Sequence, residues 1–441
     1  MDPLSTQIKS SSDLIPLSTQ TQDLSELDSQ ANILGIAKLG TLAEDLLVHL
    51  VPFFTFKEIG ALSRCNRHLH GIRLIFLNAL KIYLESLDPV TSKEAAYYLS
   101  AAALFPPPDP LLSLNPRTYS LEESPAVEET SLASIKNHYP GLEGLYLKGE
   151  VTSLTSLPAL KQLKRLRLID CRAFTPETFA PIGLLITLRE LRCINCRFPS
   201  YSGILSILGN LMHLQELNLS HSQYIQNNHF YTESGIGFIK GLISLTCLNL
   251  SRTNFIITPI DLELIGSLTR LQYLNLGGIT CNPPLSTTIF RSFNKLTQLT
   301  TLILTQWTII TDEHLNSLPY LPSLGTLHLE GCSQLTSACF QSIGKQNCLK
   351  GLNIQGITVT NVAYLQGLKG LINLRTLHMT FSTITADTLK SLLKMFPKLT
   401  VLNITLNGSS IYSIEKSELD RIRAAYPNVS IVLKLDRCLI S

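Results

Sequence analysis

The stretch LTTLILTQWTIITDEHLNSLPYLPSLGTLHL, residues 299–329, decides the fold. It begins and ends with a six-residue segment whose first, fourth and sixth residues are leucines. Apolar residues at alternating positions are typical of a half-buried strand. Between the two segments, Thr311 can cap a helix in which leucines recur about every three residues. The stretch therefore predicts a strand, a helix and the next strand.

The six-residue segment is repeated along the carboxyl-terminal two thirds of the chain, and five of the ten steps between segments are of 25 residues. Such a constant period indicates an internal repeat. Positions within a repeat are counted from the first leucine of its segment. The segments begin at Leu142, Leu163, Leu188, Leu214, Leu245, Leu271, Leu299, Leu324, Leu349, Leu374 and Leu399.

Parallel strands joined by right-handed helical crossovers must curve, because helices are wider than strands. The repeats therefore predict a horseshoe with a concave parallel sheet and convex helices. The segments HYPGL (138–142), MFPKL (395–399) and AYPNV (425–429) each combine an aromatic residue and a proline before a strand, which predicts the end of a helix. The last predicts a twelfth strand near residues 431–435, so about eleven to twelve repeats fill residues 136–436.

Residues 142–435 resemble a leucine-rich-repeat protein of the class with repeats of 25 to 28 residues and convex helices. Cys171, Cys196 and Cys332 stand where its cysteine-containing variety has cysteine. The resemblance implies an α/β fold, a leucine-rich-repeat horseshoe solenoid.

The segment LAEDLLVHLVPFF, residues 42–54, occurs once and precedes the repeats. Thr41 and Glu44 have the spacing of a capping box, which predicts the start of a helix, and Pro52 predicts its end. Thr55 and Glu58 repeat the spacing for a second helix, and apolar residues over 64–85 predict a third. A small all-α three-helix unit is expected over residues 39–87.

The segments on either side of this unit have different compositions. Residues 1–38 are rich in Ser, Thr and Gln, which predicts a disordered tail. Residues 88–135 contain a helical pattern and FPPPDP (105–110), a stiff sequence that predicts a linker.

Residues 41 to about 75 resemble an F-box, the helical motif that attaches substrate receptors to the small adaptor of a cullin-RING ubiquitin ligase. The sequence departs from the F-box at Ala43, where the family usually has proline, and at Leu69, where it prefers an aromatic residue. Ser63 and Arg64 also fit the motif. The resemblance implies adaptor-binding roles for Leu42, Glu44, Leu46, Leu47, Leu50, Ile59 and Leu62.

Composition excludes several classes of partner. The net charge of +3 does not favour nucleic acid or an anionic membrane. The longest stretch without Asp, Glu, Lys or Arg, residues 271–290, contains prolines and glycines unsuited to a membrane span. Ten cysteines without a secretory signal indicate a reducing compartment, so we expect a cytoplasmic protein, or one in the host cytosol if it is a bacterial effector. An export signal of another kind could lie in the tail.

Little in the sequence predicts catalysis, a metal or a cofactor. Cys193 and Cys196 have a CxxC spacing, but no second pair of ligands lies near them, and in the repeat frame both are packing positions. The sequence has no Gly-rich phosphate loop, H-E-x-x-H or G-x-S-x-G. Trp307, at a ninth position, is expected to be buried. We expect no enzyme activity, no metal and no cofactor.

The concave surface is the predicted binding site for a target protein. Its expected contacts are at third and fifth positions, together with aromatic residues of the long insertion after Leu214: Arg165, Arg167, Arg192, Asn218, Asn249, Asn275, His328, Asn353, His378, Tyr224, Phe230 and Tyr231. With Lys164 and Arg189, the three arginines predict a basic patch for an acidic segment of the target. A charged row that only maintains solubility is the other interpretation.

Two functions fit these features. In the first, the chain is the substrate receptor of an F-box type ubiquitin ligase, whose other subunits supply catalysis. In the second, it is a leucine-rich-repeat binding scaffold in which the amino-terminal helices cap the solenoid.

Overall fold

The computed structural model describes residues 90–91, 118–121, 126–127, 129–139, 141–172, 174–198, 205–224, 236–281, 286–359, 362–407 and 414–435. The predicted tail and the F-box-like unit, residues 1–38 and 39–87, lie outside this part of the chain. The chain divides into two compact units. The first comprises Met1–Pro125, Thr130–Leu147 and Ala159–Leu163, and the second comprises Ala126–Glu129, Lys148–Pro158 and Lys164–Ser441.

The described strands of the first unit form a parallel ladder. β2 (Thr118–Leu121) pairs with β4 (Gly144–Lys148) and with β1 (Val90–Thr91). Both β1 and β2 lie in the segment 88–135 that was predicted as a linker. This segment also contains β3 (Ala126–Val127) and most of α7 (Glu129–His138).

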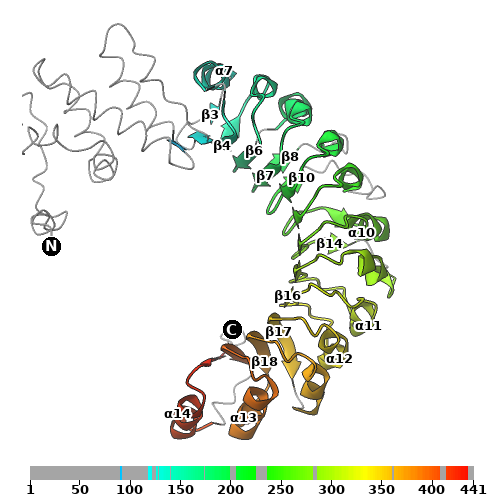
Figure 1. The fold of residues 1–441 in the computed structure, drawn as a ribbon, viewed down its shortest axis with the longest axis vertical. Coiled ribbons are helices and arrows are strands. Elements are labelled where there is room, and N and C mark those ends of the chain that lie inside the picture. Colours follow the sequence, from blue (N-terminus) through cyan, green and yellow to red (C-terminus); the bar gives the residue numbers. More distant parts are fainter. Residues whose placement is uncertain are drawn as a thin grey trace, which may run out of the picture. The chain divides into compact units, whose positions relative to one another are not determined.

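The second unit contains a parallel sheet of in-register strands. In Figure 1 these strands line the inner side of an arc, and the helices of the same unit lie on its outer side. The order along the sheet follows the chain: β6 (Arg165–Ile169), β7 (Glu190–Ile194), β9 (Glu216–Asn218), β11 (Cys247–Asn249), β13 (Tyr273–Asn275), β15 (Thr301–Ile303), β16 (Thr326–His328), β17 (Gly351–Val359), β18 (Thr376–Phe381), β19 (Val401–Leu406) and β20 (Ser430–Leu435). The predicted horseshoe sheet and its last strand are confirmed.

Short two-stranded ladders come after several of these strands on the way to the outer side. Their strands pair in parallel: β3 with β5 (Glu150–Val151), β8 (Arg197–Phe198) with β10 (Gln223–Tyr224), and β12 (Ile256–Ile257) with β14 (Thr280–Cys281).

We expected one α-helix on the outer side of every repeat, but only some of the outer segments are α-helices. The described α-helices here are α8 (Pro176–Phe179), α10 (Pro259–Gly266), α11 (Asp312–Asn316), α12 (Phe340–Gly344), α13 (Ala386–Met395) and α14 (Lys416–Ala425). The remaining segments are 3₁₀-helices: η4 (Leu157–Ala159), η5 (Ala180–Leu184), η6 (Ile207–Asn210), η7 (Gly237–Gly241), η8 (Ile289–Lys295), η9 (Ser337–Cys339) and η10 (Val362–Leu368). Adjacent 3₁₀-helices approach closely, since a Cβ on Gly241 would lie 2.2 Å from the carbonyl oxygen of Gly209.

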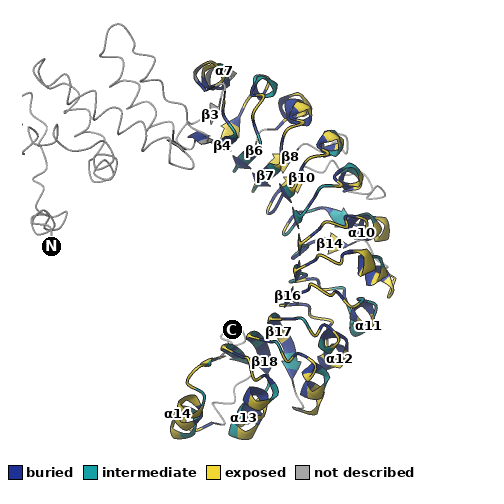
Figure 2. Cartoon of the chain, viewed as in Figure 1, coloured by how far each residue is buried: buried dark blue, intermediate teal, exposed yellow. Residues whose placement is uncertain are grey.

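Leucines at the first, fourth and sixth positions form the core, as the repeat pattern predicts. In the repeat that begins at Leu299, Leu302 and Leu304 are fully buried with it. In the second unit, buried residues lie between the strands of the inner side and the helices of the outer side (Figure 2). The apolar residues of adjacent repeats thus pack against one another and form a continuous core.

The predicted helix ends are confirmed. The side chain of Thr385 accepts a hydrogen bond from the Thr388 amide, and Thr311 forms a capping box with His314. α7, α13 and α14 end at His138, Met395 and Ala425, just before the three aromatic-proline pairs. The proline after each helix prevents another helical turn.

A left-handed residue occupies the eighth position of most repeats. The φ angle there lies between 54° and 95° in nine successive repeats, at Gly149, Asp170, Asn195, His221, Arg252, Gly278, Gln306, Gly331 and Gly356. The next two repeats have Phe381 and Leu406 at this position. These residues are the last residues of β18 and β19, which each have six residues.

Candidate functional site

The parallel register gathers the third and fifth positions of the second unit into two rows on the sheet. The fifth-position row is Arg167, Arg192, Asn218, Asn249, Asn275, Ile303, His328, Asn353, His378 and Asn403. Except for buried Asn353, these side chains are half-buried. The structure therefore brings the predicted concave residues from Arg167 to His378 into one continuous surface.

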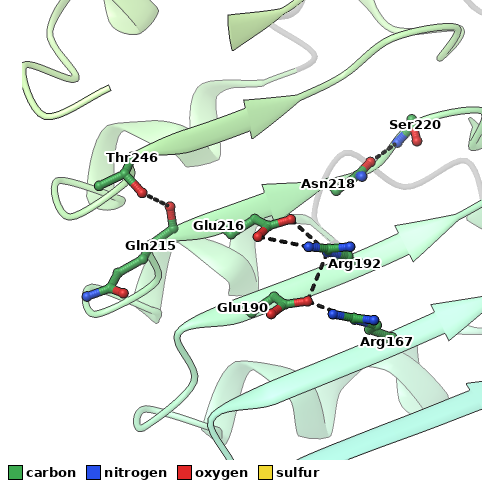
Figure 3. A network of polar contacts seen from close by, with 8 residues as sticks. All are labelled: Arg167, Glu190, Arg192, Gln215, Glu216, Asn218, Ser220 and Thr246. Carbon is green, nitrogen blue, oxygen red and sulfur yellow. Dashed lines mark hydrogen bonds and ion pairs between the residues drawn. The ribbon is translucent and has the colours of Figure 1, made fainter. Parts of the chain in front are cut away.

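Arginines and glutamates alternate at one end of this surface (Figure 3). The carboxylate of Glu190 lies 2.8 Å from Nε of Arg167 and 2.8 Å from Nε of Arg192. Arg192 also lies 2.7 Å from Glu216 and donates a hydrogen bond of 3.1 Å to it. Burial lowers the pKa of Arg192, but the hydrogen bond with Glu216 and the two carboxylate charges raise it above its ordinary value. We call these four residues the charge ladder.

Because of the charge ladder, the predicted basic patch carries negative as well as positive charges. Arg167 and Arg192 are balanced by Glu190 and Glu216, which occupy third positions on strands β7 and β9. The basic patch was predicted from its arginines and lysine alone, without the glutamates at third positions. The sequence contained the information needed to predict this charge balance. Third and fifth positions lie on the same face of the sheet, so a third-position residue lies beside the fifth-position residue of the neighbouring strand.

The fifth-position asparagines have a structural role besides their place on the surface. In four of them the Oδ1 atom accepts the amide N–H two residues later, at 3.0 Å for Asn218, Asn249 and Asn275 and at 3.1 Å for Asn353. The Nδ2 group of Asn353 donates to Glu330 at 2.9 Å. In these four residues the Oδ1 half of the amide thus holds the end of the strand, and the Nδ2 half can make contacts across the surface.

His328 and His378 lie two repeats apart in the same row. Burial lowers the pKa of both imidazoles, the charge of His378 lowers that of His328 further, and Glu330 opposes these effects. Nδ1 of His378 lies 3.2 Å from Nδ2 of Asn403. Both histidines are therefore predominantly neutral near pH 7. Within the described residues, no three or more His, Cys, Asp or Glu side chains are grouped to hold a metal ion.

The cysteines and the tryptophan singled out in the sequence are packing residues. Cys193 and Cys196 are buried, and burial raises the pKa of the Cys193 thiol. Cys332, also buried, donates a hydrogen bond of 3.1 Å from its thiol to the carbonyl of Leu304, and burial raises its pKa to about 11. Trp307 is fully buried and stacks on Phe290 with 6.0 Å between ring centroids. Their predicted packing roles are confirmed.

The other predicted site residues are placed only in part. Arg165 lies on β6 in the third-position row. Tyr224 belongs to β10, which pairs with β8 and not with the main sheet. Phe230 and Tyr231 lie outside the described residues, as do the adaptor-binding residues Leu42, Glu44, Leu46, Leu47, Leu50, Ile59 and Leu62.

The fold and the two rows define a leucine-rich-repeat solenoid. No protein-family model and no curated protein matches the chain. Among solved structures, it is similar to a leucine-rich-repeat protein of Leptospira interrogans, with 19% identity, a TM-score of 0.37 and coverage of 74% of this chain and 92% of that one. An internalin of Listeria monocytogenes is similar with 18% identity, a TM-score of 0.39 and coverage of 67% and 88%. No helix among the described residues is long and apolar enough to cross a membrane.

Proposed function

We propose that the chain is a non-catalytic receptor that binds a target protein on the concave sheet of the second unit. The continuous fifth-position row carries this proposal, because it places charged, amide and imidazole groups side by side on a rigid parallel sheet. Loops and exposed faces on a rigid scaffold are common places of recognition. The buried thiols, whose pKa values are raised, favour binding over nucleophilic catalysis by cysteine.

We further propose that the receptor belongs to a cullin-RING ubiquitin ligase and that residues 39–87 bind its adaptor. This rests on the F-box resemblance of residues 41 to about 75. The pairing of β2 with β4 and of β1 with β2 supports docking over capping, because these strands already extend the ladder beyond the first repeat. A separate cap from residues 39–87 is then not needed for that sheet edge. Buried free thiols favour a location in the reducing cytosol. This would be the cytosol of a host cell if the chain is a bacterial effector.

Co-purification with the ligase adaptor tests the proposal. The wild-type chain is compared with the double variant Leu46→Asp/Leu47→Asp, and Ile372→Asp, on an exposed turn of the repeats, is the control. We expect the wild type and the control to recover the adaptor, and the double variant to lose it. Equal recovery by all three, or none by any, would contradict the ligase role and leave a binding scaffold.

A further inference from the structure

A row of exposed apolar side chains runs along one rim of the second unit, where the chain turns from the outer segment into the strand. Ile186, Met212 and Ile243 occupy the same place in three consecutive repeats, two residues before the first leucine. These three residues are 63%, 57% and 67% exposed, and nearby Leu184 is 68% exposed. We call Leu184, Ile186, Met212 and Ile243 the apolar rim.

Packing of the hydrophobic core does not explain why apolar side chains are exposed at these positions. Each of the three equivalent residues is at the tip of a turn whose two flanking leucines are buried. The amide of the second leucine donates to the carbonyl of the first and closes the turn, at 2.9 Å from Leu188 to Leu185, 2.9 Å from Leu214 to Leu211 and 3.1 Å from Leu245 to Leu242. The turn thus holds the apolar side chain outward, although a polar residue would fit equally well.

Backbone hydrogen bonds between repeats hold the three turns side by side. The amide of Arg189 donates to Lys164 at 2.7 Å, that of Gln215 to Arg189 at 2.7 Å, and that of Thr246 to Gln215 at 2.8 Å. Adjacent strands of a sheet lie about 4.8 Å apart, so the three tips span about 10 Å. The rim residues therefore form a continuous row.

The row is confined to these repeats. At the same place, later repeats have mostly polar residues or proline: Thr269, Thr297, Pro322, Asn347 and Pro397. The exception is Ile372, which is 57% exposed and isolated between Asn347 and Pro397. Single exposed apolar residues are common on protein surfaces, whereas a contiguous row indicates a contact surface.

The margins of the apolar rim are basic. Residues 180–189, 207–215 and 237–246 contain no Asp or Glu, but they contain Arg189, His213 and Lys240, all exposed. Arg189 lies toward the sheet and Lys240 lies on η7, on the opposite margin. The nearest carboxylates on the sheet side, Glu190 and Glu216, are engaged in the charge ladder. A partner that covers the rim would gain from acidic margins of its own.

We propose that the apolar rim binds an acidic amphipathic helix of the target protein, which rests on the proposed receptor function. In a helix, residues i, i+4 and i+7 recur along one face at about 6 and 4.5 Å, which matches the spacing of the three tips. Three apolar residues of the helix cover Ile186, Met212 and Ile243. Its acidic residues on either margin pair with Arg189 and Lys240. The target is thus held by the rim as well as by the concave sheet.

A synthetic helix tests the proposal with the full-length protein. The probe is a fluorescein-labelled peptide with leucine at i, i+4 and i+7 and glutamate on both margins, and its binding is measured by fluorescence anisotropy. We expect Ile186→Asp/Ile243→Asp to weaken binding about tenfold or more, because two apolar contacts are lost. Arg189→Glu weakens it to a smaller degree. The matched control, Ile372→Asp, leaves binding unchanged.

Other outcomes would overturn the proposal. Equal loss with Ile372→Asp, or tighter binding of a peptide with lysine in place of glutamate, contradicts the assigned site or its charge preference. Rim-dependent binding to phosphatidylserine vesicles without binding of the peptide would indicate a membrane surface. Sedimentation showing a dimer that the double variant abolishes would indicate a second copy of the chain. Adaptor recovery by the rim variants separates this test from that of the ligase role, since adaptor binding is assigned to residues 39–87.

Discussion

Nε of Arg192 on β7 lies 2.7 Å from the carboxylate of Glu216 on the neighbouring strand β9. The pair continues through Glu190 to Arg167, so charges of opposite sign alternate across three strands. The side chains are 13% to 31% exposed, and water screens them only in part. The charge ladder thus links adjacent repeats at the concave surface.

Removing the central carboxylate tests the charge ladder. Glu190→Gln leaves two half-buried guanidinium groups close to each other, so we expect the free energy of unfolding to fall by about 1–2 kcal/mol, between the values for exposed and buried pairs. Urea unfolding measures the change. The control Glu263→Gln, on the exposed face of α10, should change it by less than about 0.5 kcal/mol. Similar values for both variants would contradict the role of the ladder.

The left-handed eighth position predicts a difference between two nearby glycines. Gly331 has a φ of 72°, whereas a Cβ on Gly325 would meet only the Thr300 carbonyl oxygen, at 3.7 Å. We expect Gly331→Ala to destabilise the protein by about 1–2 kcal/mol, the cost of the left-handed conformation for a residue with a Cβ. Gly325→Ala should be close to neutral. Thermal unfolding of both variants checks this, and equal melting temperatures would refute it.

The histidines predict a pH dependence of stability. Their pKa values in the folded protein lie below the ordinary value of 6.5, so the unfolded chain binds protons more readily. The stability that these groups contribute is complete above the unfolded pKa and is lost as the pH falls through it toward the folded pKa. We expect His328→Gln to reduce the fall in urea midpoint between pH 7 and pH 5. The exposed His213→Gln is the control, and it should leave the slope unchanged.

Trp307, the single tryptophan of the chain, reports on the middle repeats. Because it is fully buried against Phe290, its fluorescence should lie at short wavelength in the folded protein and shift to longer wavelength on unfolding. Trp307→Ala should cost about 3–5 kcal/mol through the cavity that it leaves, and Trp307→Phe clearly less. A tryptophan that acrylamide quenches efficiently in the folded protein would contradict its burial.

The repeat pattern predicted the sheet because each strand is specified by residues that are close together in the sequence. Leucines at the first, fourth and sixth positions define each strand, and Thr385 or a proline after the helix defines its ends. The 3₁₀-helices were missed because apolar spacing does not distinguish a narrow turn from an α-helix when a segment such as residues 206–210 is short. Tertiary contact between Gly209 and Gly241 favours the narrower form.

The candidate site was predicted less completely, since its properties depend on neighbours from other repeats. The fifth-position row can be derived from the period, but the charge balance of Arg167 requires Glu190, which is 23 residues away in the sequence. The engaged Oδ1 of Asn249 depends on the turn after its strand. The exposure of Ile243 depends on which leucines beside it face the core. The adaptor-binding role of residues 39–87 remains a prediction.

The six-residue strands β18, β19 and β20 distinguish the carboxyl-terminal repeats from the middle of the sheet, where β9, β11, β13, β15 and β16 have three residues each. Their ladders hold six paired residues, whereas β11 and β13 share only three. In a solenoid, stability is close to a sum over nearest neighbours, so a longer ladder raises the cooperativity of the repeats that it joins. Folding is then expected to nucleate at this end and to spread toward the amino terminus, and amide hydrogen exchange should be slowest where Phe381 and Leu406 replace the left-handed residue.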